Sequence, residues 1–297
     1  KANVPNGWTV EIENPEFVLT DRSPSASIGV TVTPPKNGAE GVLSFHAIND
    51  KGGRFELGSQ LIDYEHIGRQ AILSKVQTKL VRLDLKRGGN RIACIVGVGD
   101  TVPETLELIG YEIDRIPVGE IDRERLVDYD TVILGPRAFD AHAGLDKRFD
   151  ELLAYVEVGG TLISQYNTTS FRTKSRFTAP YPIKLSRDRV SEEKVEMRVL
   201  QPDHPVFNTP NRIVNDDFDN WIQERGLYYA SSWDDSYASL LSANDRGEPA
   251  RDGGLLVAQY GKGWYAYTGL SFFRQLPEGN AGAIRLFVNL ISLGHGN

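Results

Sequence analysis

The chain has 297 residues, which is enough for two domains that each bury a core of their own. Its formal net charge of −7 argues against nucleic acid and anionic membranes as partners, because both require a basic stripe. The lone Cys94 excludes an internal disulfide and any cysteine-based zinc cluster, and no apolar run is long enough to span a membrane. The chain starts KANVPNGW, without Met or a signal peptide, so we expect an excised segment of a longer protein.

Residues 1–86 predict an immunoglobulin-like β-sandwich domain. Short alternating runs are separated by Pro, Gly, Asn and Asp signals, a texture typical of antiparallel strands. KRGGN at 86–90 is the expected hinge. The expected strands are WTVEIE at 8–13, EFVLT at 16–20, ASIGVTVTP at 26–34, GVLSFHAI at 41–48 and KLVRLDL at 79–85.

Residues 87–297 predict a second domain of the α/β class. Near-continuous apolar runs alternate with amphipathic helices, as in a doubly wound parallel sheet whose strands are buried on both faces. Residues 171–253 read as an irregular insertion with short strands at 195–200 and 226–231, followed by a hairpin and a closing helix. The expected strands are 91–99, 111–118, 130–139, 161–166, 254–260 and 263–270, and the expected helices are 101–110, 124–129, 148–160 and 283–294.

Polar residues follow the ends of these predicted strands. Because the carboxyl ends of parallel strands meet at one edge of the sheet, we expect them to line a common cleft. They are Asp100, Arg137, the run Gln165, Tyr166 and Asn167, and Arg274.

The turn GVGD at 97–100 has two readings. A glycine turn that opens onto a helix is suited to a phosphate, but the third glycine of a dinucleotide fingerprint is absent and Asp100 adds negative charge. A helix N-cap role for Asp100 or Thr101 explains the same residues.

The turn after TLISQY has the form of a nucleophile elbow without a nucleophile. The Gln165 amide donates and accepts hydrogen bonds but does not attack a carbonyl, and Cys94 lies inside a predicted strand. Ser164 is expected to point into packing, and Thr168 has no histidine at a convincing spacing. No catalytic residue is therefore assigned in the leading interpretation.

No metal or cofactor is expected. The five histidines are scattered without ligand spacing, and the acidic runs at 216–219 and 234–235 lack the pattern of a calcium loop.

The insertion carries arginines and aromatic residues that allow two interpretations. Arginines beside acids form structural ion pairs or grip a carboxylate or sugar hydroxyls. The aromatic side chains either stack on sugar rings or form the core of the insertion. The polar candidates are Arg187, Arg189, Glu224 and Arg225, and the aromatic ones are Trp221, Tyr228, Tyr229, Trp233 and Tyr237.

Longer stretches resemble known families. GGNRIACIVGVGDTVPETLELIGYEIDRI, YDTVILGPRAF, LLAYVEVGGTLISQYN and GLLVAQYGKGWYAYTGLSF resemble the ThuA-like branch of the class I glutamine amidotransferase-like fold, a flavodoxin-like α/β sheet. In that alignment Gln165 stands where the family's cysteine nucleophile would be. YEHIGRQ, PYPIKLSRDRV, WIQERGLYY and YTGLSFFRQLP extend a resemblance to the C-terminal region of bacterial PIG-L (LmbE-like) deacetylases over nearly the whole chain.

The resemblance implies a non-catalytic accessory segment of a sugar-processing protein. Its partners would be a carbohydrate and a neighbouring deacetylase domain, with a periplasmic or secreted location. The deacetylase signature, Pro-x-Asp-Asp with a later histidine, is absent, and PDHP at 202–205 only superficially matches it. The alternatives are a ThuA-like sugar hydrolase or isomerase, with Glu224 or Asp100 as general base, and a purely structural or oligomerisation domain.

Overall fold

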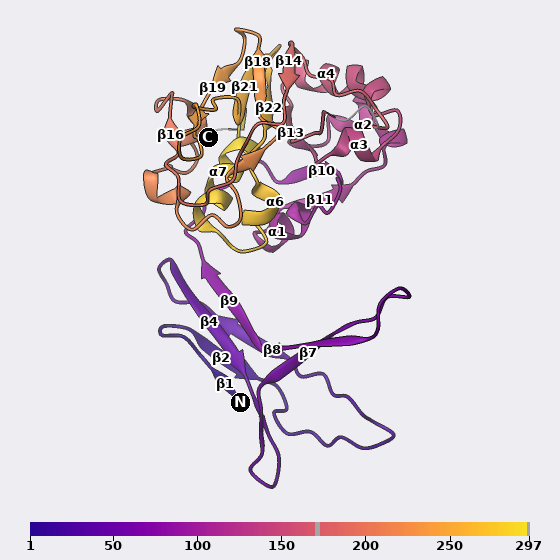
Figure 1. Cartoon of the computed structure of the whole chain (residues 1–297), viewed down its shortest axis with the longest axis vertical. Helices are drawn as coiled ribbons and strands as arrows, with labels where there is room; N and C mark the ends of the chain where they lie inside the picture. The colour runs from indigo at the N-terminus through magenta and orange to yellow at the C-terminus, as the bar shows by residue number, and fades with distance from the viewer. Residues whose placement is uncertain (170–172, 296–297) are drawn as a thin grey trace. The chain divides into compact units, whose positions relative to one another are not determined.

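The structure, a computed structural model, describes residues 1–169 and 173–295. Its internal contacts divide the chain into two compact units, Lys1–Asp84 and Leu85–Asn297 (Figure 1). The first unit consists of strands alone, and the second combines strands with helices. The boundary lies two residues before the one expected from the sequence.

The first unit is built from short antiparallel strands. One sheet has the order β1-β4-β9, and the other strands form the pairs β2–β3, β5–β6 and β7–β8. The strands are β1 Ala2–Asn3, β2 Thr9–Ile12, β3 Val30–Thr33, β4 Ala39–Phe45, β5 Ala47–Ile48, β6 Arg54–Phe55, β7 Leu57–Ile62, β8 Gln70–Lys75 and β9 Gln77–Arg82.

This unit differs from the sequence prediction in several details. The strand expected at 16–20 is absent: only a bridge between Thr20 and Ser23 forms there, and Val18 is 82% exposed. The hairpin β7–β8 was not predicted, because its residues do not alternate cleanly between apolar and polar. Leu43 is the one hydrophobic side chain of this unit that is buried in the structure. The packed second layer of a sandwich therefore stays a prediction.

The second unit contains a seven-stranded mixed sheet. Five neighbouring strands are parallel, in the order β11-β10-β12-β13-β22, and β21 and β19 extend the sheet in antiparallel fashion. This is the expected α/β class with a flavodoxin-like parallel sheet. The strands are β10 Arg91–Ile95, β11 Glu112–Arg115, β12 Thr131–Leu134, β13 Thr161–Gln165, β19 Ala238–Ser239, β21 Leu255–Tyr260 and β22 Gly263–Thr268.

Helices cover both faces of the sheet, which explains why its central strands are continuously apolar (Figure 1). Phe139, Phe149 and Leu152 pack on Val132 and Leu162 from one side. On the other side α7 lies against β13. The helices are α1 Val102–Leu108, α2 Arg123–Leu126, α3 Ala138–Ala141, α4 Phe149–Glu157, α5 Pro205–Asn208, α6 Phe272–Gln275 and α7 Ala281–Ile291, with 3-10 turns at Val118–Glu120, Asp146–Arg148 and Asn215–Phe218.

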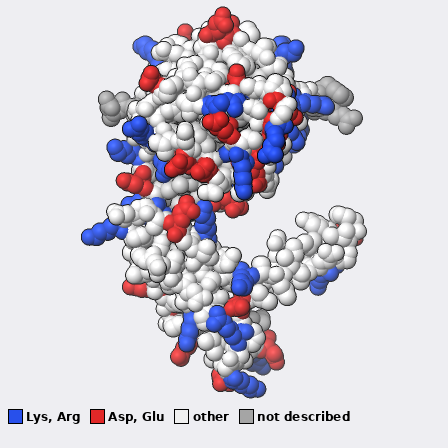
Figure 2. Space-filling model, turned by 60° about the vertical axis from the view of Figure 1, so that its left-hand side comes forward, with Lys and Arg blue, Asp and Glu red and all other residues white. Residues whose placement is uncertain are grey.

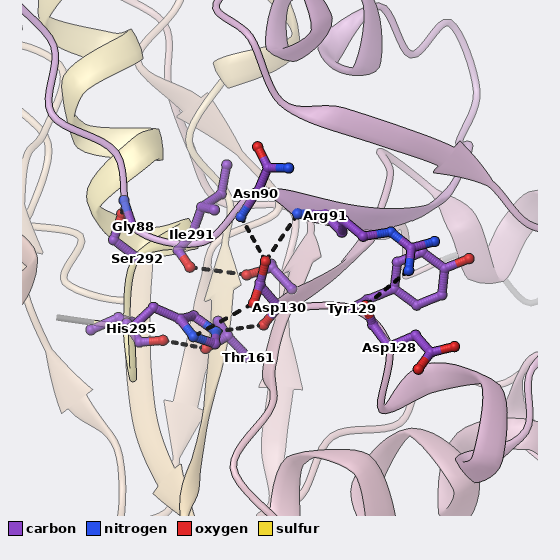
Figure 3. A network of polar contacts seen from close by, with 12 residues as sticks. Gly88, Asn90, Arg91, Asp128, Tyr129, Asp130, Thr161, Ile291, Ser292 and His295 are labelled. Atoms are coloured by element: carbon purple, nitrogen blue, oxygen red, sulfur yellow. Dashed lines mark hydrogen bonds and ion pairs between the residues drawn. The ribbon is translucent and has the colours of Figure 1, made fainter. Parts of the chain in front are cut away.

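The amino-terminal edge of the sheet is closed by a polar network around Asp130 (Figure 3). The Asp130 carboxylate accepts hydrogen bonds from the backbone N–H groups of Asn90 (2.6 Å) and Arg91 (2.9 Å). Nε2 of His295 lies 2.7 Å from the Asp130 carbonyl oxygen. The starts of β10 and β12 and the segment after α7 are therefore tied together, and this edge is occupied by structural contacts.

The insertion forms three small two-stranded pairs. They are β14 Ile183–Leu185 with β18 Ala230–Trp233, β15 Arg189–Val190 with β17 Gly226–Leu227, and β16 Arg198–Val199 with β20 Leu241–Ser242. The single strand expected at 226–231 is wrong, because Tyr228 has a left-handed backbone (φ 53°) that separates β17 from β18. Residues 170–172, where the insertion begins, lie outside the described residues.

The predicted closing hairpin is present as β21–β22. Its turn needs glycine at 261, where φ is 58° and a Cβ atom would lie 2.5 Å from the carbonyl oxygen of Glu157. Lys262 donates a backbone hydrogen bond to the same oxygen (2.9 Å), so the turn is fixed to the end of α4. Among the described residues, every helix is too short or too polar to cross a lipid bilayer.

Candidate functional site

The loops that follow the parallel strands are joined by backbone hydrogen bonds. Val98, after β10, donates to the carbonyl of Pro136, after β12 (2.8 Å). Arg137 in turn donates to the carbonyl of Tyr166, after β13 (2.7 Å). Three strand ends are thus held in one fixed arrangement, as the parallel topology predicts.

Arg137 is placed by an unusual backbone conformation. Its φ of 59° lies in the left-handed region, which costs a side-chain-bearing residue roughly 1 kcal/mol. The turn carries Nε of Arg137 to within 2.8 Å of the Asp140 carboxylate, one turn along α3, while the arginine side chain remains 41% exposed. The described residues provide no hydrogen-bond partner for its two Nη nitrogens.

Tyr166 lies between two aromatic side chains. Its ring stacks on Tyr228 at 5.8 Å with an interplanar angle of 4°, and it packs at 5.3 Å on Phe273. Tyr228 has the second left-handed backbone of the site. The sequence identifies Tyr228 as an aromatic candidate, but its partnership with Tyr166 depends on this backbone turn and could not be inferred.

Glu224 and Arg274 form a partly buried ion pair beside these rings. Nε of Arg274 lies 2.9 Å from Oε1 of Glu224, whose side chain is only 9% exposed. The guanidinium also lies over the ring of Phe273, 4.8 Å from its centre. As for Arg137, its Nη nitrogens have no hydrogen-bond partner among the described residues.

The electrostatics of the Tyr166 hydroxyl link these groups. Burial raises its pKa, and the nearby positive charges of Arg137 and Arg274 act in the opposite direction. Both guanidinium groups therefore act on one phenol. We name the set Arg137, Tyr166, Glu224, Tyr228, Phe273 and Arg274 the strand-end cluster.

Two predicted ligand-binding residues are buried beside the cluster. Asn167 accepts a hydrogen bond from the backbone of Phe139 (3.0 Å) and donates one to the carbonyl of Gln165 (2.8 Å), so it holds the start of α3. Gln165 is fully buried, and neither polar atom of its side chain has a hydrogen-bond partner among the described residues. The described contacts of Asn167 are structural, and Gln165 has no solvent-accessible surface.

Asp100 caps the loop after β10. Its carboxylate accepts hydrogen bonds from the backbone of Gly97 (3.2 Å) and Val102 (3.1 Å), the first residue of α1. Burial raises the pKa of this carboxyl, and the two backbone hydrogen bonds oppose the shift. The contacts of Asp100 therefore support the capping interpretation of GVGD. The N-cap position itself is occupied by Thr101, whose side chain makes no capping hydrogen bond.

The remaining predicted arginines lie outside the strand-end cluster. Arg225 is buried, donates to the carbonyl groups of Phe218 and Val195, and serves the interior of the insertion. Arg189 belongs to strand β15, and both it and Arg187 are exposed.

Apart from Tyr228, the aromatic candidates of the insertion divide into two groups. Trp221, Tyr229 and Tyr237 are buried, as the core interpretation predicts. Trp233 instead borders a hollow of about 900 Å³, formed by residues 176–184 and 232–234 together with Asp146. A smaller hollow of about 500 Å³ adjoins it along residues 173–177.

Within residues 1–169 and 173–295, no three His, Cys, Asp or Glu side chains gather in a group able to hold a metal ion. On the face of the molecule drawn in Figure 2, positive and negative side chains are interspersed.

Comparisons with known proteins concern the fold alone. No family model and no curated protein matches this chain. Similar solved structures include cytoplasmic protein STM3548 from Salmonella typhimurium, with 14% identity and a TM-score of 0.45 over 79% of this chain and 94% of that one. A ThuA-like protein from Bacteroides uniformis has 12% identity and a TM-score of 0.42 over 70% and 91%. A GMP synthase protein from Thermoplasma acidophilum has 12% identity and 0.41 over 70% and 96%.

These neighbours are 12–14% identical to this chain, and each of their TM-scores lies below 0.5. At these TM-scores they carry no argument about function. The fold class rests on the strand order of the sheet.

Proposed function

We propose that the unit Leu85–Asn297 binds carbohydrate, and that its strand-end cluster recognises a sugar that carries a carboxylate. The observation that carries this proposal is the pair of guanidinium groups beside Tyr166. Nε of Arg137 and Nε of Arg274 each donate to an acid, and no acceptor among the described residues occupies their Nη nitrogens, which are left for a ligand. Arginine binds carboxylates through such paired N–H groups.

The neighbouring rings supply the apolar part of the site. Sugar-binding sites combine an aromatic face with a few fixed polar groups. Tyr228 is half-buried and stacks on Tyr166, so its position is fixed before a ligand arrives. A fixed site lowers the entropic cost of binding.

The test is a titration with D-glucuronate and with D-glucose, followed by the backbone amide signals of the strand-end loops. We expect glucuronate to bind more tightly than glucose, and Arg274→Ala and Arg137→Ala to lose most of the difference. Arg187→Ala is the matched control, since Arg187 keeps solvent contact and lies outside the cluster. Equal responses to both sugars in the wild type would contradict the proposal.

A second candidate is the ThuA-like hydrolase or isomerase acting on a sugar. It is favoured by Glu224, the almost buried carboxylate of the strand-end cluster. A general base must be held within hydrogen-bond reach of the proton that it removes. Glu224→Gln would abolish the turnover of aldoses or aryl glycosides in this case, and would change little if the unit only binds sugar.

The wider role stays a proposal that rests on the sequence resemblance. It comprises an accessory segment beside a PIG-L-type deacetylase domain, a periplasmic or secreted location, and a sandwich fold for residues 1–86. A chain that carries such a deacetylase domain would test it: loss of the two cluster arginines should weaken saccharide binding and leave the deacetylation rate at saturation unchanged. A structural or oligomerisation role would leave sugar titrations blank.

A further inference from the structure

The hollow beside Trp233 is independent of the strand-end cluster. It is bordered by residues 176–184, residues 232–234 and Asp146, and we name it the Trp233 groove. Its two sides are connected by the β14–β18 pair, in which Ile183 lies opposite Trp233. Asp234 also donates a backbone hydrogen bond to the carbonyl of Pro182 (3.0 Å). Residues 182–185 and 230–234, on the two sides of the groove, are therefore joined by backbone hydrogen bonds.

The aromatic walls of the groove are fixed by the core beneath it. Phe177 packs edge-on against Phe139 (5.5 Å) and Tyr267 (5.6 Å). Tyr181 donates from its hydroxyl to the carbonyl of Gln259 (3.1 Å), and its ring packs on Tyr260 (5.8 Å). These side chains do not have to reorganise when a ligand binds, which reduces the entropic cost of binding.

The polar groups of the groove are balanced in charge. Arg176 and Lys184 bring two cations, and Asp146 and Asp234 bring two carboxylates. Asp234 accepts a hydrogen bond from the backbone of Ser236 (2.9 Å), whereas the side chains of the other three have no ion-pair or hydrogen-bond partner among the described residues. The described residues of the groove therefore offer donors and acceptors together, and they bring no net charge to select an ion.

We propose that the Trp233 groove binds a neutral oligosaccharide. Hydroxyl groups both donate and accept hydrogen bonds, so they match adjacent cations and carboxylates, and the C–H faces of sugar rings match a half-buried indole. The volume of about 900 Å³ lies within the range of roughly 300–1,000 Å³ typical of small-molecule sites. The balanced charge separates this groove from the strand-end cluster, for which an acidic sugar is proposed.

The experiment is a titration of the whole chain with maltotetraose and with cellotetraose, followed by backbone amide shifts and by tryptophan fluorescence. We expect one of the two to shift signals of residues 176–184 and 232–234. Trp233→Ala should weaken its binding by at least about tenfold, which corresponds to about 1.4 kcal/mol. Asp146→Asn, a change that removes charge and little volume, should weaken it by a smaller factor.

Two controls keep the result interpretable. Asp150→Asn changes an exposed acid of α4 outside the groove and should bind as the wild type does. Arg274→Ala alters the strand-end cluster and should leave tetrasaccharide binding unchanged, so the two proposals fail separately. Absence of binding by both tetrasaccharides, or equal affinity in the wild type and in the correctly folded Trp233→Ala and Asp146→Asn variants, would overturn the inference. Amide shifts confined to other residues would also overturn it.

Discussion

Gln165 and Gln275 are both fully buried glutamines with opposite hydrogen-bond states. Gln275 accepts from the backbone of Ile222 (2.8 Å) and donates to its carbonyl (2.9 Å), whereas the amide of Gln165 has no partner among the described residues. A buried polar group without a partner costs free energy, and a bonded one contributes to stability.

This contrast predicts the outcome of two matched substitutions. Gln275→Met should lower the free energy of unfolding by about 2 kcal/mol or more, because it leaves the backbone of Ile222 unsatisfied. Gln165→Met should change it by less than about 1 kcal/mol or raise it. Chemical denaturation of both variants measures the difference. Similar losses in the two would show that the Gln165 amide is hydrogen-bonded in solution.

Cys94 is the second residue whose surroundings decide its chemistry. It lies within β10, only 2% exposed, and burial raises the pKa of its thiol well above the usual range. The thiolate is the reactive form of cysteine. At mildly alkaline pH the native protein should therefore react with Ellman's reagent at least about 100-fold more slowly than the unfolded chain does. The chain has a single cysteine, so one thiol signal reports this directly. Fast reaction of the folded protein would contradict the buried position.

At the scale of elements, the two edges of the sheet have different tasks. The amino-terminal edge is closed by the Asp130 network of Figure 3, and the carboxyl edge carries the strand-end cluster. This division follows from the parallel part of the sheet, in which the strands start at one edge and end at the other.

The network makes Asp130 a stability residue. Asp130→Ala removes the acceptor of the backbone N–H groups of Asn90 and Arg91, which are exposed enough for water to replace it in part, so the free energy of unfolding should fall by about 0.5–1.5 kcal/mol. Asp128→Ala is the matched control, because this neighbouring carboxylate is exposed and its residue contributes through its backbone carbonyl. Thermal or chemical unfolding measures both variants, and an equal loss in the two would refute the assignment.

Element by element, the sequence predicts regular segments better than irregular ones. The parallel strands, α4, α7 and the β21–β22 hairpin follow from apolar runs and glycine signals that are local in the chain. The prediction of one strand at 226–231 is wrong because Tyr228 adopts a left-handed backbone, which the local residue pattern does not predict. The expected strand at 16–20 fails because it finds no neighbouring strand to pair with.

At the scale of the whole molecule, buried hydrophobic side chains are unevenly distributed. In the described structure they belong to Leu85–Asn297, with the exception of Leu43 in the first unit. Since apolar burial is the main source of stability, the two units should differ strongly when they are produced separately.

Expression of the two units as fragments tests this. Residues 85–297 alone should unfold in one cooperative transition and keep near-ultraviolet circular dichroism. Residues 1–84 alone should show strand content with a weak or absent transition, because short hairpins without a covered face are marginally stable. A sharp transition of the first fragment would instead favour the packed sandwich predicted from its sequence.

The sequence by itself determined the two-part organisation, the α/β character of the larger part and the set of polar residues at its strand ends, because these depend on short-range periodicity and on chain order. Tertiary structure alone decided which of those residues meet. In the folded chain Arg137 and Arg274 both lie near Tyr166. Arg225 lies in the interior of the insertion, and Trp233 lies at a groove. Such meetings depend on left-handed turns and on packing between segments far apart in the chain, neither of which is written in local residue patterns.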